Sequence, residues 1–133
     1  MSVTIILTII IVHYIGDFVF QTHWQASNKS KNNVALLSHT GIYSLIWLLG
    51  GILYILPVMN ATTDLEWEAL VGKFCIAFPL ITFICHTITD YITSRINSYL
   101  WAKGDVHNFF VCVGGDQVLH YIQLFLTFKL LIQ

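Results

Sequence analysis

Four long apolar segments constrain this chain more than any other feature of its sequence. They cover residues 3–20, 36–56, 70–92 and 109–132. Each is about 18 to 24 residues long, and an α-helix needs about 20 apolar residues to cross a hydrocarbon layer of ~30 Å. Helices are favoured over strands because an open strand would leave backbone groups without hydrogen-bond partners in lipid. The pattern therefore predicts an all-α, four-helix transmembrane bundle.

Composition agrees with a membrane protein. Hydrophobic residues make up 56% of the 133 residues and charged residues only 10%, whereas soluble domains carry about 25% charged residues. The net charge of -1 argues against a strongly basic nucleic-acid-binding protein. We expect one integral membrane domain over residues 1–133, in contact with the lipid bilayer, with helices at roughly 3–22, 35–57, 69–93 and 107–132.

The distribution of basic residues predicts the orientation. The polar segments 21–33 and 93–108 share one side of the membrane and hold Lys29, Lys31, Arg95 and Lys103, whereas the opposite side holds Lys73 and Lys129. Cytoplasmic segments are enriched in Lys and Arg. We therefore expect these two segments in the cytoplasm and both termini facing outward. The segment 93–108 can also hold a short helix on the membrane surface.

Ionisable residues inside the apolar segments form a repeated pattern. Three segments carry a His and an Asp four positions apart, and the second segment adds one His near its start. The residues are His13 and Asp17, His86 and Asp90, Asp116 and His120, and His39. An i, i+4 spacing places both members of a pair on one helical face. Such residues are costly in a membrane and mark functional sites by default.

The depths of these residues agree with one another. In antiparallel helices, the second half of the first and third segments lies level with the first half of the second and fourth. All seven groups therefore fall in the same half of the bilayer, which the orientation above makes the cytoplasmic half. We predict that they converge into one polar cluster.

Histidine nitrogens and carboxylate oxygens are ordinary ligands of Zn²⁺ and related ions. We interpret His13, Asp17, His39, His86, Asp90, Asp116 and His120 as metal ligands or as their hydrogen-bonding partners. Zn²⁺ is expected first, with Mn²⁺ or Fe as alternatives, and one or two ions fit this many groups. A proton or ion relay and a purely structural hydrogen-bond network remain alternatives.

Further residues are assigned by role. Asp17, Asp90 and Asp116 are the candidate catalytic residues, because a carboxylate that does not bind the metal can act as general base. Gln21, Lys29, Arg95 and Gln117 are the candidate substrate-binding residues near a cytoplasmic mouth, where they can hold an anionic group. Contacts of these residues with solvent or lipid headgroups are the alternative reading. His23 and His107 are expected at the surface.

At these residues the chain resembles the family called domain of unknown function 3307, small membrane proteins of bacteria and phages. The resemblance rests on the run from His13 to Trp24 with Lys29, Lys31 and His39, on the stretch from His86 to Asp90, and on the stretch from Asp116 to His120. It covers nearly the whole chain and implies a location in the bacterial inner membrane. At the position of His23 many relatives are expected to carry an acidic residue, which argues against His23 as a ligand. The chain is also distantly similar to predicted membrane-bound metal-dependent hydrolases.

The sequence thus favours a metal-dependent hydrolase that acts on a membrane-associated lipid or on an anionic small molecule. Two non-enzymatic alternatives stay open. One is a transport unit for divalent cations or protons, for which a homo-oligomer is expected because four helices are few. The other is a phage or host interaction protein with a structural metal site. A catalytic site should open beside a cleft, a transporter should show a polar path to both sides, and a structural site should be closed.

Overall fold

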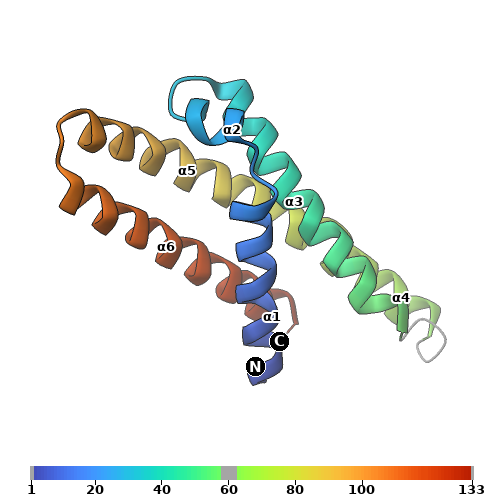
Figure 1. Ribbon diagram of the computed structural model, residues 1–133. Coiled ribbons are helices and arrows are strands. Elements are labelled where there is room, and N and C mark those ends of the chain that lie inside the picture. Colours follow the sequence, from blue (N-terminus) through green and yellow to red (C-terminus); the bar gives the residue numbers. More distant parts are fainter. Residues whose placement is uncertain (1, 58–62, 133) are drawn as a thin grey trace.

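The computed structural model describes residues 2–57 and 63–132, and all regular structure in these two ranges is helical (Figure 1). In chain order the elements are α1 (Val3–Tyr14), the π-helical turn η1 (Ile15–Val19), α2 (His23–Asn28), α3 (Asn33–Ile55), α4 (Asp64–Val71), the π-helical turn η3 (Gly72–Ala77), α5 (Phe78–Ala102) and α6 (Val106–Ile132). The predicted all-α class is confirmed for this part of the chain.

Helix starts follow from capping residues. Thr22 caps α2 in a reciprocal capping box with Gln25, and Asn32 accepts hydrogen bonds from two backbone N–H groups at the start of α3. Both caps satisfy donors that a helix start leaves free. The predicted polar segment 21–33 therefore contains helix α2 and a turn over residues 29–31, and it brings Lys29 back toward the bundle.

The third helix is much longer than its predicted range of 69–93. Helix α4, η3 and α5 form one continuous helix from Asp64 to Ala102, 39 residues long, which at 1.5 Å per residue spans about 58 Å. The predicted loop at 93–108 was wrong, because the chain is helical up to Ala102 and again from Val106. Gly104 makes the turn with a φ of +73°, a conformation that favours glycine. Between the predicted helices at 35–57 and 69–93, residues 58–62 lie outside the described residues.

Three helices are long and apolar enough to cross a membrane, namely α3, the continuous helix from Asp64 and α6. The N-terminal apolar helix, Val3–Val19, is shorter, so the predicted fourth spanning helix stays a prediction. Burial supports a lipid environment, because large apolar side chains such as Leu53 and Leu130 are 70% and 81% exposed while polar residues occupy the interior.

Helices α5 and α6 run side by side as a hairpin, α3 crosses α5, and α1 packs against α6 and α3 (Figure 1). The apolar core consists of Ile9, Tyr43, Trp47, Phe78 and Leu124, which come from α1, α3, α5 and α6. It lies on the side of the crossing away from α2. This core holds the four segments in register, so that their polar residues meet in one layer.

Two π-helical turns adjust the packing. In η3 the wider turn precedes Pro79, whose ring would clash with a carbonyl of a regular helix four residues earlier. Helix α3 approaches η3 so closely that a Cβ on Gly51 would lie 2.5 Å from the carbonyl oxygen of Phe74. In η1 the wider turn contains Asp17, and π-turns are frequent at functional sites.

Candidate metal centre

The seven ionisable residues of the apolar segments converge in the middle of the bundle. The four histidines are 0 to 1% exposed, Asp90 is 1% exposed and Asp17 is 5% exposed. Asp116 is less buried, with 12% of its side chain exposed. Because all four predicted segments contribute, the predicted polar cluster is present in the structure.

Four ligand atoms form a compact group. They are Oδ1 of Asp17, Nε2 of His39, Nε2 of His86 and Oδ2 of Asp90. Nε2 of His39 lies 3.0 Å from the Asp17 oxygen, 3.3 Å from the Asp90 oxygen and 3.2 Å from Nε2 of His86. Nε2 of His86 lies 3.4 Å from the Asp17 oxygen and 3.6 Å from the Asp90 oxygen. We call these four residues the first group.

The spacing of the first group matches a tetrahedral metal site. Four ligands bound at 2.0–2.1 Å to one Zn²⁺ ion lie about 3.3–3.4 Å from one another. The five measured separations in the first group run from 3.0 to 3.6 Å. The residues present therefore fit a four-coordinate divalent ion in both ligand type and spacing.

A second group lies beside the first and shares Asp17 with it. Asp17, Asp116 and His120 each offer a ligand atom within 4.8 Å of the others. Nε2 of His120 lies 3.4 Å from Oδ1 of Asp116 and 3.3 Å from Oδ1 of Asp90. Because Oδ2 of Asp90 belongs to the first group, this carboxylate faces both groups, an arrangement that suits one ion or two neighbouring ions.

His13 has a different environment from the other histidines. Its Nδ1 lies 2.7 Å from the hydroxyl of Tyr43, and its Nε2 lies 2.9 Å from Oε1 of Gln117. Gln117 in turn donates from Nε2 to Oδ2 of Asp17 and to Oδ2 of Asp116, both at 3.1 Å. Both ring nitrogens of His13 are thus engaged, and the structure places this residue beside the two groups, where it positions the Gln117 amide.

Aromatic stacking orients the histidine rings. The ring of His86 lies between Tyr43, with centroids 4.0 Å apart, and His120, with centroids 4.1 Å apart. Nδ1 of His86 and Nδ1 of His120 are buried with no hydrogen-bond partner in the described ranges. The flat contacts with Tyr43 and between the two histidines therefore hold these rings, and Nε2 of each ring points into the cluster.

Two cluster residues were missed by the sequence analysis. Tyr43 is fully buried against His13 and His86, and the hydroxyl of Thr93 donates to Oδ1 of Asp116 at 2.6 Å. Both had a signal in the sequence. Tyr43 follows His39 by four residues and Thr93 follows Asp90 by three, so each shares a helical face with a predicted ligand.

Of the predicted substrate-binding residues, Lys29 comes closest to the cluster. Its Nζ lies 2.8 Å from Oδ2 of Asp90, and its side chain is 19% exposed. Burial alone would lower the pKa of Lys29, but the carboxylates of Asp90 and Asp17 outweigh burial and raise this pKa above its ordinary value. Lys29 is therefore a charged ammonium at the edge of the first group.

The other predicted substrate-binding residues lie in different places. Gln117 belongs to the cluster itself, and Gln21 is half-buried with an Nε2 that has no partner among the described residues. Arg95 is held at the surface by the carbonyl of Tyr91 and by Asn33, and its guanidinium stacks on the Tyr91 ring. The structure thus does not bring Arg95 to the cluster.

Surface and sulfur residues play no part in the two groups. His23 and His107 are exposed, as predicted, and the half-buried cysteines Cys75, Cys85 and Cys112 are free thiols. Within the described ranges, the groups able to hold a metal ion contain histidine and aspartate alone. The donor set therefore suits a hard or borderline divalent cation.

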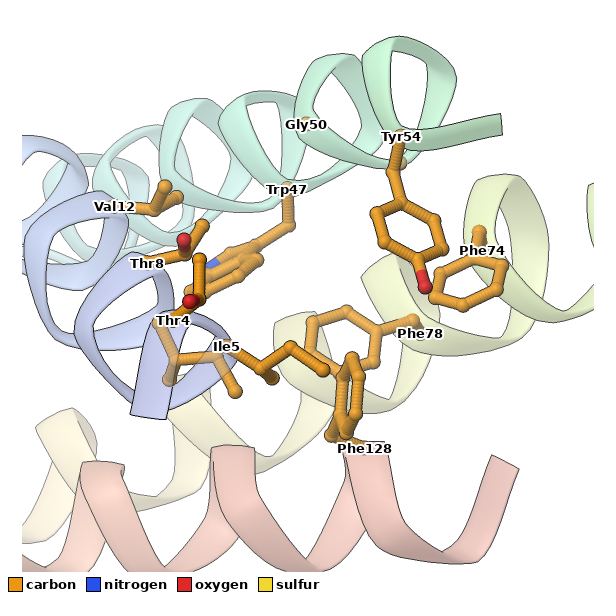
Figure 2. Close-up of a pocket in the computed structure, with 12 residues that line it drawn as sticks. Thr4, Ile5, Thr8, Val12, Trp47, Gly50, Tyr54, Phe74, Phe78 and Phe128 are labelled. Carbon is orange, nitrogen blue, oxygen red and sulfur yellow. The ribbon is translucent and has the colours of Figure 1, made fainter. Parts of the chain in front are cut away.

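An apolar cavity of about 270 Å³ lies on the far side of the core from α2. Figure 2 shows its lining, in which side chains such as Trp47, Tyr54, Phe74, Phe78 and Phe128 face Ile5 and Val12 of α1. Trp47 lines this cavity and packs against Tyr43, whose ring in turn stacks on the metal ligand His86. The cluster is thus bounded on this side by aromatic rings and apolar side chains.

The chain belongs to the family described as "Protein of unknown function (DUF3307)", which matches residues 5–133. The resemblance seen in the sequence is thereby confirmed over almost the whole length. Comparisons with curated proteins and with solved structures gave no match. The family description names no activity, so the function has to be argued from the geometry of the cluster.

Proposed function

We propose that this member of the DUF3307 family is an integral membrane metalloprotein that binds a divalent cation, Zn²⁺ first, in the first group. The observation that carries the proposal is the spacing of four buried ligand atoms from η1, α3 and α5, with measured separations of 3.0 to 3.6 Å. The Nε2 atoms of His39 and His86 both lie within 3.0 to 3.6 Å of the same two carboxylate oxygens, so the four atoms surround one point.

Charge balance supports one divalent ion. Asp17, Asp90 and Asp116 bring three negative charges into a buried cluster, and Lys29 brings one positive charge. Buried charges without compensation are strongly destabilising. One divalent cation bound by neutral histidines would leave the cluster electrically neutral. A second ion in the group of Asp17, Asp116 and His120 would add two positive charges, which suits an anionic substrate.

We further propose that the protein is a hydrolase. A divalent ion held by the first group would supply Lewis-acid chemistry, and because zinc can expand from four to five ligands it could also bind a water and lower the pKa of that water. Asp116 lies outside the first group and is the least buried of the three carboxylates. Thr93 and Gln117 hold it in place by hydrogen bonds at 2.6 and 3.1 Å. It is thus the carboxylate best placed to act as general base.

The surroundings of the cluster favour an enzyme over the two alternatives. A polar pocket opens next to Lys29 on the side of α2, whereas aromatic and apolar residues bound the cluster on the side of the apolar cavity. A transporter would need a polar path in both directions, and a structural site would need no pocket. We propose that the polar side faces the cytoplasm of a bacterial inner membrane, following the basic residues of that side.

The metal content of protein purified without added metal tests this proposal. Elemental analysis should find about one equivalent of a transition metal in the wild type and in His107→Ala, whose histidine is exposed and distant from the cluster. His86→Ala should lose the metal, because His86 is a ligand of the first group. Asp116→Ala should retain the metal but lose the proposed hydrolase activity, because Asp116 lies outside the first group and is the proposed general base. Wild-type protein that stays metal-free after zinc loading and dialysis would overturn the proposal.

A further inference from the structure

The polar pocket beside the cluster has the chemistry of a headgroup site. It encloses about 490 Å³ between α2, α5 and α6. Its lining in the described chain contains one lysine, Lys29, several serines and Asn97, and no carboxylate. Its lysine offers an ammonium group, and its serines and Asn97 offer further hydrogen-bonding groups, a combination that suits a phosphate ester.

The pocket begins at the proposed metal site. Lys29 lines the pocket and its Nζ also lies 2.8 Å from Oδ2 of Asp90. On α5, Ser94 and Asn97 follow Asp90 by four and seven residues, so the three side chains lie along one face of the helix. At 1.5 Å per residue, Ser94 is about 6 Å and Asn97 about 10 Å along the axis from Asp90. A group bound in this pocket would therefore reach the metal ligands.

Two polar atoms of this lining lack partners. Ser94 is 8% exposed, and its Oγ has no hydrogen-bond partner among the residues that the structure describes. Oδ1 of Asn97 is likewise buried and unpartnered there. Buried polar groups are nearly always hydrogen-bonded in native proteins. A ligand that accepts a bond from Ser94 and donates one to Asn97 would satisfy both, as a phosphate next to a hydroxyl group does.

The outer edge of the pocket is apolar. Trp101 and Phe110 line it and are 60% and 62% exposed. Tryptophan prefers the boundary between lipid headgroups and hydrocarbon. A ligand in this pocket would thus meet lysine and serine on the inside and aromatic rings on the lipid-facing side, which matches an amphiphile better than a small sugar phosphate.

We propose that this pocket binds the headgroup of an anionic, hydroxyl-bearing phospholipid, with the phosphate on Lys29 and Ser94 and the hydroxyl on Asn97. The proposal rests on the proposed hydrolase function, because it names the substrate class of that site. It assigns Lys29 a double contact, with Asp90 on one side and the headgroup phosphate on the other.

Binding of short-chain lipids by the purified protein in detergent tests the proposal. The probes are dihexanoyl-phosphatidylglycerol, dihexanoyl-phosphatidylcholine and glycerol 3-phosphate, each titrated by microscale thermophoresis. We expect phosphatidylglycerol to bind at least tenfold more tightly than phosphatidylcholine. A weaker affinity for glycerol 3-phosphate supports a lipid ligand. An equal affinity would overturn the lipid part of the proposal and assign the pocket to a soluble phosphate ester.

Matched variants locate the binding. Lys29→Met should weaken phosphatidylglycerol binding at least tenfold, and Ser94→Ala about three- to tenfold. The controls are Lys31→Met, a nearby exposed lysine outside the pocket, and Ser44→Ala, an equally buried and unpartnered serine on α3. Both controls should stay within twofold of the wild type. Equal binding of the two lipids, or equal effects of Lys29→Met and Lys31→Met, would overturn the proposal.

The same samples separate this inference from the proposed function. Stoichiometric zinc without selective lipid binding would overturn the headgroup site and leave the metalloprotein proposal standing. Selective binding of phosphatidylglycerol by a protein that takes up no zinc would overturn the metal-dependent function and leave the pocket as a lipid-binding site.

Discussion

Replacement of Lys29 by methionine should strengthen metal binding, because it removes a cation that shares a ligand atom with the proposed site. Nζ of Lys29 lies 2.8 Å from Oδ2 of Asp90, and this oxygen is one of the four atoms of the first group. An ion bound at 2.0–2.1 Å from the same oxygen would lie within about 5 Å of the ammonium. The two cations therefore repel each other and compete for one carboxylate.

The size of the effect follows from this contact. A hydrogen bond to a charged group contributes about 1.5–3 kcal/mol, and metal binding must weaken the bond from Lys29 to Asp90. In Lys29→Met this hydrogen bond is already absent, so zinc binding no longer has to weaken it. At about 1.4 kcal/mol per factor of ten, the Kd for zinc should therefore fall by a factor of roughly 10 to 100. Coulomb repulsion acts in the same direction, since unit charges 4 Å apart interact by about 4 kcal/mol at an effective dielectric constant of about 20.

Zinc titrations against a competing chelating dye measure this change. Lys31→Met is the control for loss of a lysine from the same polar segment, and Lys29→Arg keeps the charge. Both should bind zinc with nearly wild-type affinity. A Kd that is unchanged or higher in Lys29→Met would refute the placement of the metal at Asp90. Because the same variant should bind the lipid headgroup more weakly, opposite shifts in the two affinities identify Lys29 as the residue between the two sites.

Three further predictions concern packing, ligand roles and pH. The free energy of unfolding should be about 1–3 kcal/mol lower for Gly51→Ala than for Gly50→Ala, as measured by thermal unfolding in detergent. A Cβ at Gly51 would lie 2.5 Å from the η3 backbone, whereas a Cβ at Gly50 has open space. Equal stabilities would contradict this packing. Elemental analysis should find no stoichiometric zinc in His39→Ala. His13→Asn should still bind zinc, with an affinity about 10- to 100-fold weaker than that of the wild type. Loss of zinc from both variants would make His13 a ligand. Since the pKa of Lys29 is raised above 10.5 in the folded protein, its stabilising contribution is complete below pH 10.5 and is lost as the pH rises through the raised value. The stability difference between wild type and Lys29→Met should therefore shrink above pH 10.5, and a constant difference up to pH 12 would argue against the ion pair.

Much of the cluster could be predicted from the sequence because helical periodicity is a local property. A His and an Asp four residues apart share a face in any helix, and antiparallel packing brings matching depths together. This reasoning identified all seven ionisable residues of the cluster. It could not divide them into groups, because the rotation of each helix about its axis depends on contacts of the whole core, such as Tyr43 on His86.

The role of Lys29 was only partly predictable. Its place in a basic polar segment suggested a position near the mouth, but its contact with Asp90 depends on α2, which folds the segment back onto the bundle. Thr22 and Asn32 cap the helices on either side of this fold. The fixation of Arg95 on Tyr91 and Asn33 likewise depends on which neighbours the folded chain provides.

The errors in the fold arose where polar residues occur in a helix. Half of residues 93–102 are polar, namely Thr93, Ser94, Arg95, Asn97 and Ser98, and this composition favoured a loop. The helix continues because no glycine or proline interrupts it before Gly104, and because Thr93 and Ser94 face the cluster and the pocket rather than lipid. The first helix is shorter than predicted because it ends at Val19 after the wide turn that contains Asp17.

X-ray absorption spectroscopy of the protein loaded with one equivalent of zinc observes the ligands of the bound ion themselves. We expect a four-coordinate zinc with nitrogen and oxygen neighbours at about 2.0–2.1 Å, together with the outer-shell scattering of two imidazole rings from His39 and His86. The same measurement on His39→Ala or His86→Ala should find no zinc bound at this site. Sulfur neighbours at about 2.3 Å, or a six-coordinate shell of water oxygens without imidazole, would show that zinc does not bind in the first group.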